Sequence, residues 1–183
     1  MRKPSVNVGD RFENTIGHWF TIITYFPSGI YDGEFRNAKC LVRFDSGYET
    51  FAAINHLKGG YVKDRFRKQI YGIGYLGKDK VKNVRIYNLW RRVLRCYDKK
   101  HYYHKYGVTV CKRWHNFSNF QKDVVKLEGY DQNNLKRNGN KGLELDKDIK
   151  GNGKLYSPET CVWVTKRENA LQRWNGNNYR RVI

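Results

Sequence analysis

The sequence is poor in acidic residues, in proline and in long apolar runs. Of its 183 residues, only 17 are aspartate or glutamate and only three are proline. No apolar run approaches the length of about 20 residues that a membrane-spanning helix needs. The first residues also lack the apolar core of a secretory signal. We therefore expect a soluble, intracellular protein with no membrane partner.

Cysteine is scarce and irregularly spaced. The four cysteines, Cys40, Cys96, Cys111 and Cys161, form no CxxC pair. This spacing favours neither a disulfide framework nor a common zinc site, so we expect buried thiols. The sequence also contains no heptad repeat, and no dimerisation motif is apparent.

Positive charge is abundant, and it is concentrated in the second half of the chain. Thirty-six lysines and arginines against 17 acids give a net charge of +19. Residues 1–80 contribute 13 − 8 = +5 and residues 81–183 contribute 23 − 9 = +14. Solubility alone needs a net charge of about 2 to 8 for a small domain. The surplus indicates a polyanionic partner.

Two modules of different composition are expected, in the α+β class. In residues 1–78, short runs of β-forming residues at 19–25 and 40–51 are separated by glycine turns, which predicts a small β module, a meander or barrel. Three glycines within 71–77 predict a flexible hinge. Residues 79–183 are then a basic α+β module.

The basic module should begin with a helix that has an arginine-rich surface. Apolar residues recur at helical spacing from Ile86 to Tyr97. Between them stand four arginines and no acid, and arginine matches phosphate in bidentate geometry. The alternative is an ordinary solvated helix face. The four arginines are Arg85, Arg91, Arg92 and Arg95.

A second helix is expected from Ser118 to Leu127. Ser118 and Gln121 have the spacing of a capping box, and the apolar residues that follow recur at helical intervals. Between the two predicted helices, residues 98–110 interleave lysines with tyrosines and histidines, as a loop that contacts phosphates and bases would do.

The segment from 143 to 174 predicts a strand, a turn, a second strand and a helix. Residues 143–149 and 161–164 are the strands, and Thr165 with Glu168 has capping-box spacing for the helix. Asp146 and Asp148 stand near the end of the first strand, close to Asn152. Carboxylate and amide oxygens suit a hard cation such as Mg²⁺, although a solvated surface turn uses the same residues.

Many spaced residues between 87 and 169 carry a resemblance to a known family. The segment resembles phage and bacterial proteins related to HNH homing endonucleases, some of which have Apetala-two-type DNA-binding modules. Residues 6–80 also resemble an N-terminal module that accompanies this phage family. The matching positions are Trp90, Arg95-Cys96-Tyr97, Tyr103, Tyr106-Gly107-Val108, Val110-Cys111, Trp114, Phe117, Phe120, Leu145-Asp146-Lys147-Asp148-Ile149, Tyr156-Ser157-Pro158-Glu159, Cys161-Val162-Trp163-Val164-Thr165 and Asn169.

The resemblance implies a metal-dependent DNA endonuclease, in the host cytoplasm if phage-encoded. In that family a ββα unit presents a base, usually histidine, at the end of its first strand, and metal ligands from strand and helix. No histidine follows His115 here, so Asp146 is the candidate base, with Asn152 orienting. Asp148 and Asn169 are the candidate ligands for Mg²⁺ or Mn²⁺. Aspartate is a weak base at neutral pH, which keeps the alternative open of a non-catalytic DNA- or RNA-binding protein on the same fold.

The residues expected to contact nucleic acid share a positive charge and a place in the second module. They are Arg85, Arg91, Arg92, Arg95, Lys99, Lys100, Lys105, Lys136, Arg137, Lys141, Lys147, Lys166, Arg167 and Arg173.

Overall fold

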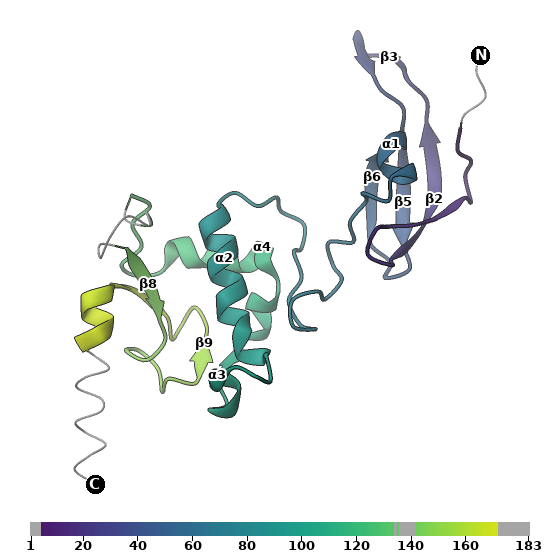
Figure 1. The fold of residues 1–183 in the computed structure, drawn as a ribbon. Helices are drawn as coiled ribbons and strands as arrows, with labels where there is room; N and C mark the ends of the chain where they lie inside the picture. The colour runs from purple at the N-terminus through teal and green to yellow at the C-terminus, as the bar shows by residue number, and fades with distance from the viewer. Residues whose placement is uncertain (1–4, 134, 136–141, 172–183) are drawn as a thin grey trace. The chain divides into compact units, whose positions relative to one another are not determined.

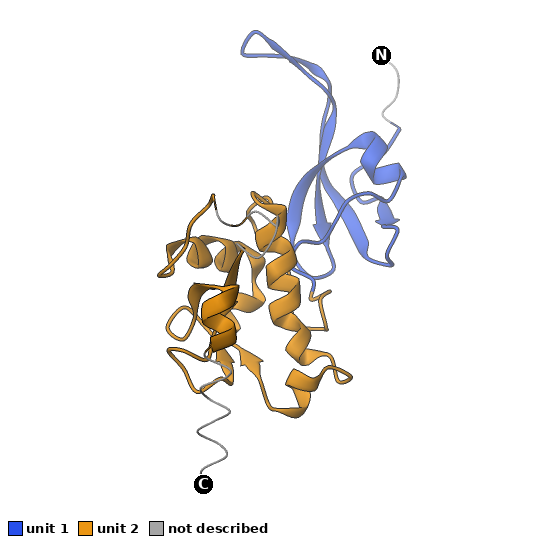
Figure 2. Cartoon of the chain, turned by 60° about the vertical axis from the view of Figure 1, so that its left-hand side comes forward, with its two compact units in different colours: residues 1–67 blue, residues 68–183 orange. Residues whose placement is uncertain are grey.

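The chain forms two compact units, and the α+β class is confirmed. A computed structural model describes residues 5–133, 135 and 142–171. Unit 1 comprises residues 1–67 and unit 2 comprises residues 68–183 (Figure 2). The division therefore follows Arg67, whereas the sequence places the module boundary after residue 78. Within the described residues, no helix combines the length and the apolar character needed to cross a bilayer.

Unit 1 is built on a four-stranded antiparallel sheet with the order β1-β2-β5-β6. This is a meander with one hairpin, β3–β4, inserted between its second and third strands, followed by a short helix. The elements are β1 (Arg11–Glu13), β2 (Trp19–Phe26), β3 (Gly29–Tyr31), β4 (Glu34–Arg36), β5 (Lys39–Phe44), β6 (Glu49–Ala53) and α1 (Ile54–Lys58).

One face of this sheet carries the core of unit 1. Phe20 pairs with Phe44 and Ile22 pairs with Val42, and all four side chains are buried. Alternate residues of a strand point to the same side of the sheet, so these pairs pack under Leu57 of α1. The inserted hairpin turns at Asp32 and Gly33, which both have positive φ as a tight two-residue turn requires.

Unit 2 combines short helices with small strand pairs (Figure 1). In chain order its elements are α2 (Val84–Val93), η1 (Leu94–Tyr97), α3 (Tyr102–Lys105), β7 (Thr109–Val110), η2 (Lys112–His115), α4 (Phe117–Asp123), η3 (Val124–Lys126), β8 (Leu143–Asp146), β9 (Leu155–Tyr156) and β10 (Val162–Thr165), where η marks a 3-10 helix.

Aromatic side chains hold the core of unit 2 together. Trp90, Trp114 and Phe117 are fully buried. The Trp90 Nε1 donates a hydrogen bond of 2.7 Å to the Trp114 carbonyl oxygen, and its ring centroid lies 5.3 Å from that of Phe117. A buried indole needs such an acceptor, because an unpaired N–H away from water is costly. The core therefore fixes which face of α2 points outward.

The predicted helices occur, but the capping of the second one differs. The expected helix from Ile86 to Tyr97 is α2 followed by η1, in which the helix tightens. Helix α4 is capped by Asn116, whose Oδ1 accepts from the Ser118 N–H at 2.9 Å. The predicted capping box of Ser118 and Gln121 is therefore wrong. Both side chains face an earlier segment of the chain instead.

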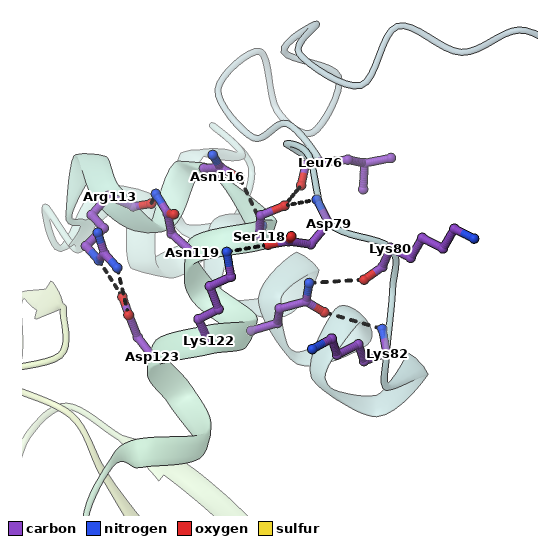
Figure 3. Close-up of polar contacts among 11 residues, drawn as sticks. Leu76, Asp79, Lys80, Lys82, Arg113, Asn116, Ser118, Asn119, Lys122 and Asp123 are labelled. Atoms are coloured by element: carbon purple, nitrogen blue, oxygen red, sulfur yellow. Dashed lines mark hydrogen bonds and ion pairs between the residues drawn. The ribbon is translucent and has the colours of Figure 1, made fainter. Parts of the chain in front are cut away.

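The second part of the predicted hinge at 71–77 is not a free connection, because residues 74–82 are packed against the rest of unit 2. The Ser118 hydroxyl donates to the Leu76 carbonyl at 2.9 Å and accepts from the Asp79 N–H at 2.8 Å (Figure 3). The Gln121 side chain bonds the backbone of Lys80 and Lys82. Polar side chains of α4 thus form hydrogen bonds with the backbone of this segment and hold it in place.

Gly77 lies at the centre of this contact, and its replacement tests whether the segment is fixed. Its φ is +74°, and a Cβ there would meet Asn116 Oδ1 and, at 2.7 Å, Ser118 Oγ. We expect Gly77→Ala to lower the free energy of unfolding by about 3 kcal/mol, from backbone strain and overpacking together. Gly72 is the matched control, since its φ is +70° but no atom lies within 4 Å of the added Cβ. Gly72→Ala should cost only about 1 kcal/mol. Equal losses in urea denaturation would contradict the packing argument.

The predicted strand–strand–helix unit at the end of the chain is present. β8 and β10 pair antiparallel, with Asp146 opposite Val162. Residues 166–171 are helical, and Thr165 with Glu168 forms the predicted capping box: the Glu168 carboxylate accepts from the Thr165 N–H at 2.7 Å, and the Thr165 hydroxyl accepts from the Glu168 N–H at 3.2 Å. Between β8 and β10 the chain forms β9, which pairs in parallel with β7.

Candidate nucleic-acid interface

A groove of about 960 Å³ lies between helix α2 and strand β8. We call it the arginine groove. One side is formed by the exposed face of α2 and η1, and the other by Leu143, Glu144 and Lys166. Five basic side chains line it against two carboxylates, so its net charge is positive. The basic residues are Arg85, Arg91, Arg92, Arg95 and Lys166.

The arginines of the groove are exposed because the core uses the opposite face of α2. Trp90 and Val93 are buried, and Arg91, Arg92 and Arg95 lie on the remaining faces. None of these three guanidinium groups forms an ion pair with a carboxylate among the residues that the structure describes. Their charge is therefore available to a ligand in the groove.

The two acids of the groove are partly engaged elsewhere. The Glu144 Oε2 accepts a hydrogen bond of 2.5 Å from Asn169 Nδ2. The Asp98 Oδ1 accepts from the Lys100 backbone N–H at 3.0 Å. Neither carboxylate forms an ion pair with an arginine in the described part of the chain, so the arginine groove attracts anions.

A smaller cavity of about 240 Å³ adjoins the arginine groove, and Arg92, Arg95 and Glu144 line both. We call it the β8 cavity. It brings together side chains from α2, η1, the α3 loop, β8, β9 and the last helix. Its polar and aromatic lining consists of Arg92, Arg95, His101, Tyr103, Glu144, Asp146, Lys147, Asp148, Tyr156 and Asn169.

The carboxylate of Asp146 organises the turn that follows β8. Asp146 is buried, and its Oδ1 accepts from the backbone N–H groups of Asp148 at 2.7 Å and Ile149 at 2.9 Å. An aspartate that satisfies two N–H groups of the following residues is a recurrent turn-forming device. This structural role accounts for one of its two oxygens.

Lys147 is a buried lining residue of the β8 cavity. Its side chain is only 5% exposed, and its Nζ donates to Asp148 Oδ1 at 2.9 Å. The ammonium also lies 5.0 Å from the ring centroid of Tyr103 and 5.4 Å from that of Tyr156, as in cation–π contacts. A buried lysine needs such compensation, because burial alone disfavours its charged form.

The walls of the β8 cavity are aromatic. Burial raises the pKa of the Tyr156 phenol above its ordinary value, so this group stays neutral at physiological pH. His101 accepts a hydrogen bond from the Tyr103 N–H through its Nδ1, at 3.2 Å. The cavity is therefore a polar and aromatic recess that is lined in part by Lys147.

The site residues predicted from the sequence divide into those inside the β8 cavity and those outside. Asp146, Asp148 and Asn169 line it together, as the sequence led us to expect. Asn152 does not line it; it is exposed, and its Oδ1 accepts from the Lys154 N–H at 3.1 Å.

The predicted basic residues divide in the same way. Four arginines of α2 and η1 and Lys166 line the arginine groove, and Lys147 lies in the β8 cavity. Four further residues are exposed but line neither the arginine groove nor the β8 cavity: Lys99, Lys100, Lys105 and Arg167. The remaining four lie outside the described residues: Lys136, Arg137, Lys141 and Arg173.

The expected ligands for Mg²⁺ or Mn²⁺ do not fit a divalent cation as they stand. The Lys147 ammonium lies against Asp148 Oδ1, where a ligand oxygen would face the metal. Asn169 turns its amide nitrogen toward Glu144. Over the described parts of the chain, no group of three or more histidines, cysteines and carboxylates is arranged to hold a metal ion. The metal assignment stays a prediction.

The sequence interpretation missed Glu144, His101, Tyr103 and Tyr156 as lining residues. For Glu144 a signal existed, because residues 144 and 146 of a strand point to the same side. The others come from segments that only the tertiary fold brings to β8. The predicted buried thiols are confirmed for Cys40, Cys96 and Cys161, whereas Cys111 is half-buried.

Comparison with known proteins gives no family for this chain. No protein-family model matches it, and neither a curated protein nor a solved structure shows significant similarity to it.

Proposed function

We propose that this protein binds nucleic acid, with duplex DNA as the favoured ligand, through the arginine groove of unit 2. The single observation that carries the proposal is the row of exposed arginines along α2 and η1 that lines a groove of about 960 Å³ without a carboxylate partner in the described residues. Arginine forks pair with phosphate in bidentate geometry. The net charge of +19 would also speed the encounter with a polyanion.

The resemblance to proteins related to HNH homing endonucleases supports the same ligand class. The residues that carry it include Trp90, whose burial sets the orientation of helix α2, and Arg95, which lines the arginine groove. They also include Asp146, Lys147 and Asp148, which line the adjoining β8 cavity. The proposal therefore has a sequence argument and an electrostatic argument that meet in the same part of unit 2.

Fluorescence anisotropy with the full chain and a labelled DNA duplex tests the proposal. If Arg85, Arg91, Arg92 and Arg95 each neutralise one phosphate, log Kd should change with log salt with a slope of at least about 3.6. A duplex RNA and a single-stranded DNA of equal length serve as comparators. Tighter binding of the RNA would change the ligand class. Absence of binding at low salt would refute the proposal.

A second candidate function is DNA cleavage. The observation that favours it is the β8 cavity, in which Asp146, Asp148 and His101 lie beside Arg92 and Arg95. A carboxylate or imidazole near a bound phosphate is the minimum that hydrolysis needs. Supercoiled plasmid should then be nicked in Mg²⁺ or Mn²⁺, and Asp146→Ala and Asp148→Ala should abolish the nicking. Binding without nicking in either metal would leave the binding function alone.

A further inference from the structure

We infer that the β8 cavity is a phosphate pocket in which the ammonium of Lys147 supplies the positive charge that a metal ion would supply elsewhere. The inference rests on the proposed function, which places a nucleic-acid backbone in the adjoining groove. Its ligand is one phosphate group of that backbone.

The charge of Lys147 is held at one place by its surroundings. The side chain is 5% exposed and is enclosed by the rings of Tyr103 and Tyr156. An ammonium has three N–H groups, and among the described residues only Asp148 accepts a hydrogen bond from it. Two donors therefore remain for a ligand that enters the β8 cavity. Such a ligand meets a preorganised charge, so binding does not carry the entropic cost of ordering a flexible lysine side chain.

The other groups around the β8 cavity favour an anion over a cation. Arg92 and Arg95 are exposed at its junction with the arginine groove, without a described carboxylate partner. The carboxylate of Asp146 accepts two backbone N–H groups, and that of Glu144 accepts from Asn169. Asp148 forms an ion pair with Lys147, and its side chain is 48% exposed, so solvent also screens its charge. The acids are thus engaged, whereas the two arginines are available.

The dimensions of the cavity agree with a phosphate group. A volume of about 240 Å³ lies below the roughly 300 to 1,000 Å³ of pockets that enclose whole small molecules. The cavity also adjoins a groove that suits an extended ligand, and three residues line both. A backbone phosphate can therefore enter the cavity while its neighbours stay in the groove.

Two substitutions in opposite directions test the inference. Lys147→Met keeps the apolar stem but removes the charge, and it leaves Asp148 solvated, because that side chain is 48% exposed. We expect about a tenfold loss of affinity for duplex DNA and a salt slope lower by about 0.9, as for one lost phosphate contact. Asp148→Asn releases the ammonium from its carboxylate and should tighten binding about threefold. A metal site requires the opposite result for Asp148→Asn.

Inorganic phosphate provides a direct probe that does not depend on DNA. Phosphate, compared with chloride at equal ionic strength, should raise the melting temperature of the wild type, because a ligand of the native state stabilises it. The rise should vanish in Lys147→Met, increase in Asp148→Asn and be the same in EDTA and in Mg²⁺. Lys154→Met and Glu159→Gln are controls of equal charge change, since neither residue lines the cavity or the groove.

An unchanged phosphate effect and an unchanged salt slope in Lys147→Met would overturn the inference. Weaker DNA binding by Asp148→Asn would also overturn it, and so would Mg²⁺-dependent nicking that Asp148→Ala abolishes. If Lys147→Met fails to fold, Asp148→Asn alone decides, because its two expected outcomes differ in sign. If the wild type binds no nucleic acid, the proposed function fails, and the phosphate titration still decides whether the pocket exists.

Discussion

Replacing Arg91, Arg92 and Arg95 together with glutamine is expected to reduce the affinity for duplex DNA by about a hundredfold to a thousandfold at moderate salt. The reason is that each guanidinium loses a charge-assisted contact with a phosphate, and each such contact is worth about tenfold. The slope of log Kd against log salt should fall by about 2.7, which is three times 0.9. The measurement is fluorescence anisotropy over a series of salt concentrations.

The substitutions should leave the fold intact. All three side chains are exposed, and the core of unit 2 uses Trp90 and Val93 on the opposite face of α2. Arg91 lies over the Tyr87 ring, 6.0 Å from its centroid, and this packing contact would be weakened. A circular dichroism spectrum and melting temperature close to those of the wild type would show that the loss is one of binding.

A control with the same change in net charge separates the groove from a general effect of charge. Three exposed lysines of unit 2 line neither the arginine groove nor the β8 cavity: Lys112, Lys126 and Lys154. Their joint replacement by glutamine removes three positive charges, as the arginine variant does. It should lower the affinity by less than about tenfold, because distant charges act only through the screened long-range field. Equal losses in both variants would refute the groove as the binding surface.

Trp90→Ala is expected to have the largest effect on stability. Removing a fully buried tryptophan costs about 3 to 5 kcal/mol, and the Trp114 carbonyl that accepts its N–H would lose its partner. Most single domains have a total stability of about 5 to 15 kcal/mol. The variant should therefore leave unit 2 partly unfolded near physiological temperature.

The loss should be confined to unit 2, because the two units have separate hydrophobic cores. Amide hydrogen exchange of Trp90→Ala should accelerate in α2, α4 and β10 and stay unchanged in β2 and β5. Tyr106→Ala is the matched control, since this large aromatic residue of unit 2 is 68% exposed and should cost less than about 1 kcal/mol. Faster exchange throughout unit 1 would contradict the separation of the two cores.

Features determined by neighbouring residues could be predicted from the sequence. The strands of unit 1 followed from alternating β-formers between glycine turns. The box of Thr165 and Glu168 was found because both partners lie within one helical turn. The same spacing failed at Ser118, because Leu76, 42 residues away, is an acceptor that the local pattern does not contain.

Features that depend on tertiary packing could be predicted only in part. Three glycines near residue 74 predicted a flexible connection. Position 74 instead leaves no room for a side chain, because an added Cβ would meet the side chains of Leu94 and Trp90. In the β8 cavity, the alternation of β8 gives Asp146 and Glu144 the same side. It gives no indication that Lys147 would fold back between Tyr103 and Tyr156, since β8 ends at Asp146.

The parallel pairing of β7 with β9 has a consequence for how the protein is made. Thr109 pairs with Leu155 and Val110 pairs with Tyr156. Strand β7 is therefore synthesised first and cannot form this pairing until strand β9 has been synthesised. The core of unit 1 is complete once Val62 has emerged. Unit 2 instead closes only after Trp163 has been synthesised, because the Trp163 indole N–H donates to the Val124 carbonyl. Until then its aromatic helices are exposed to other nascent chains, and rapid synthesis of residues 124–163 favours correct folding.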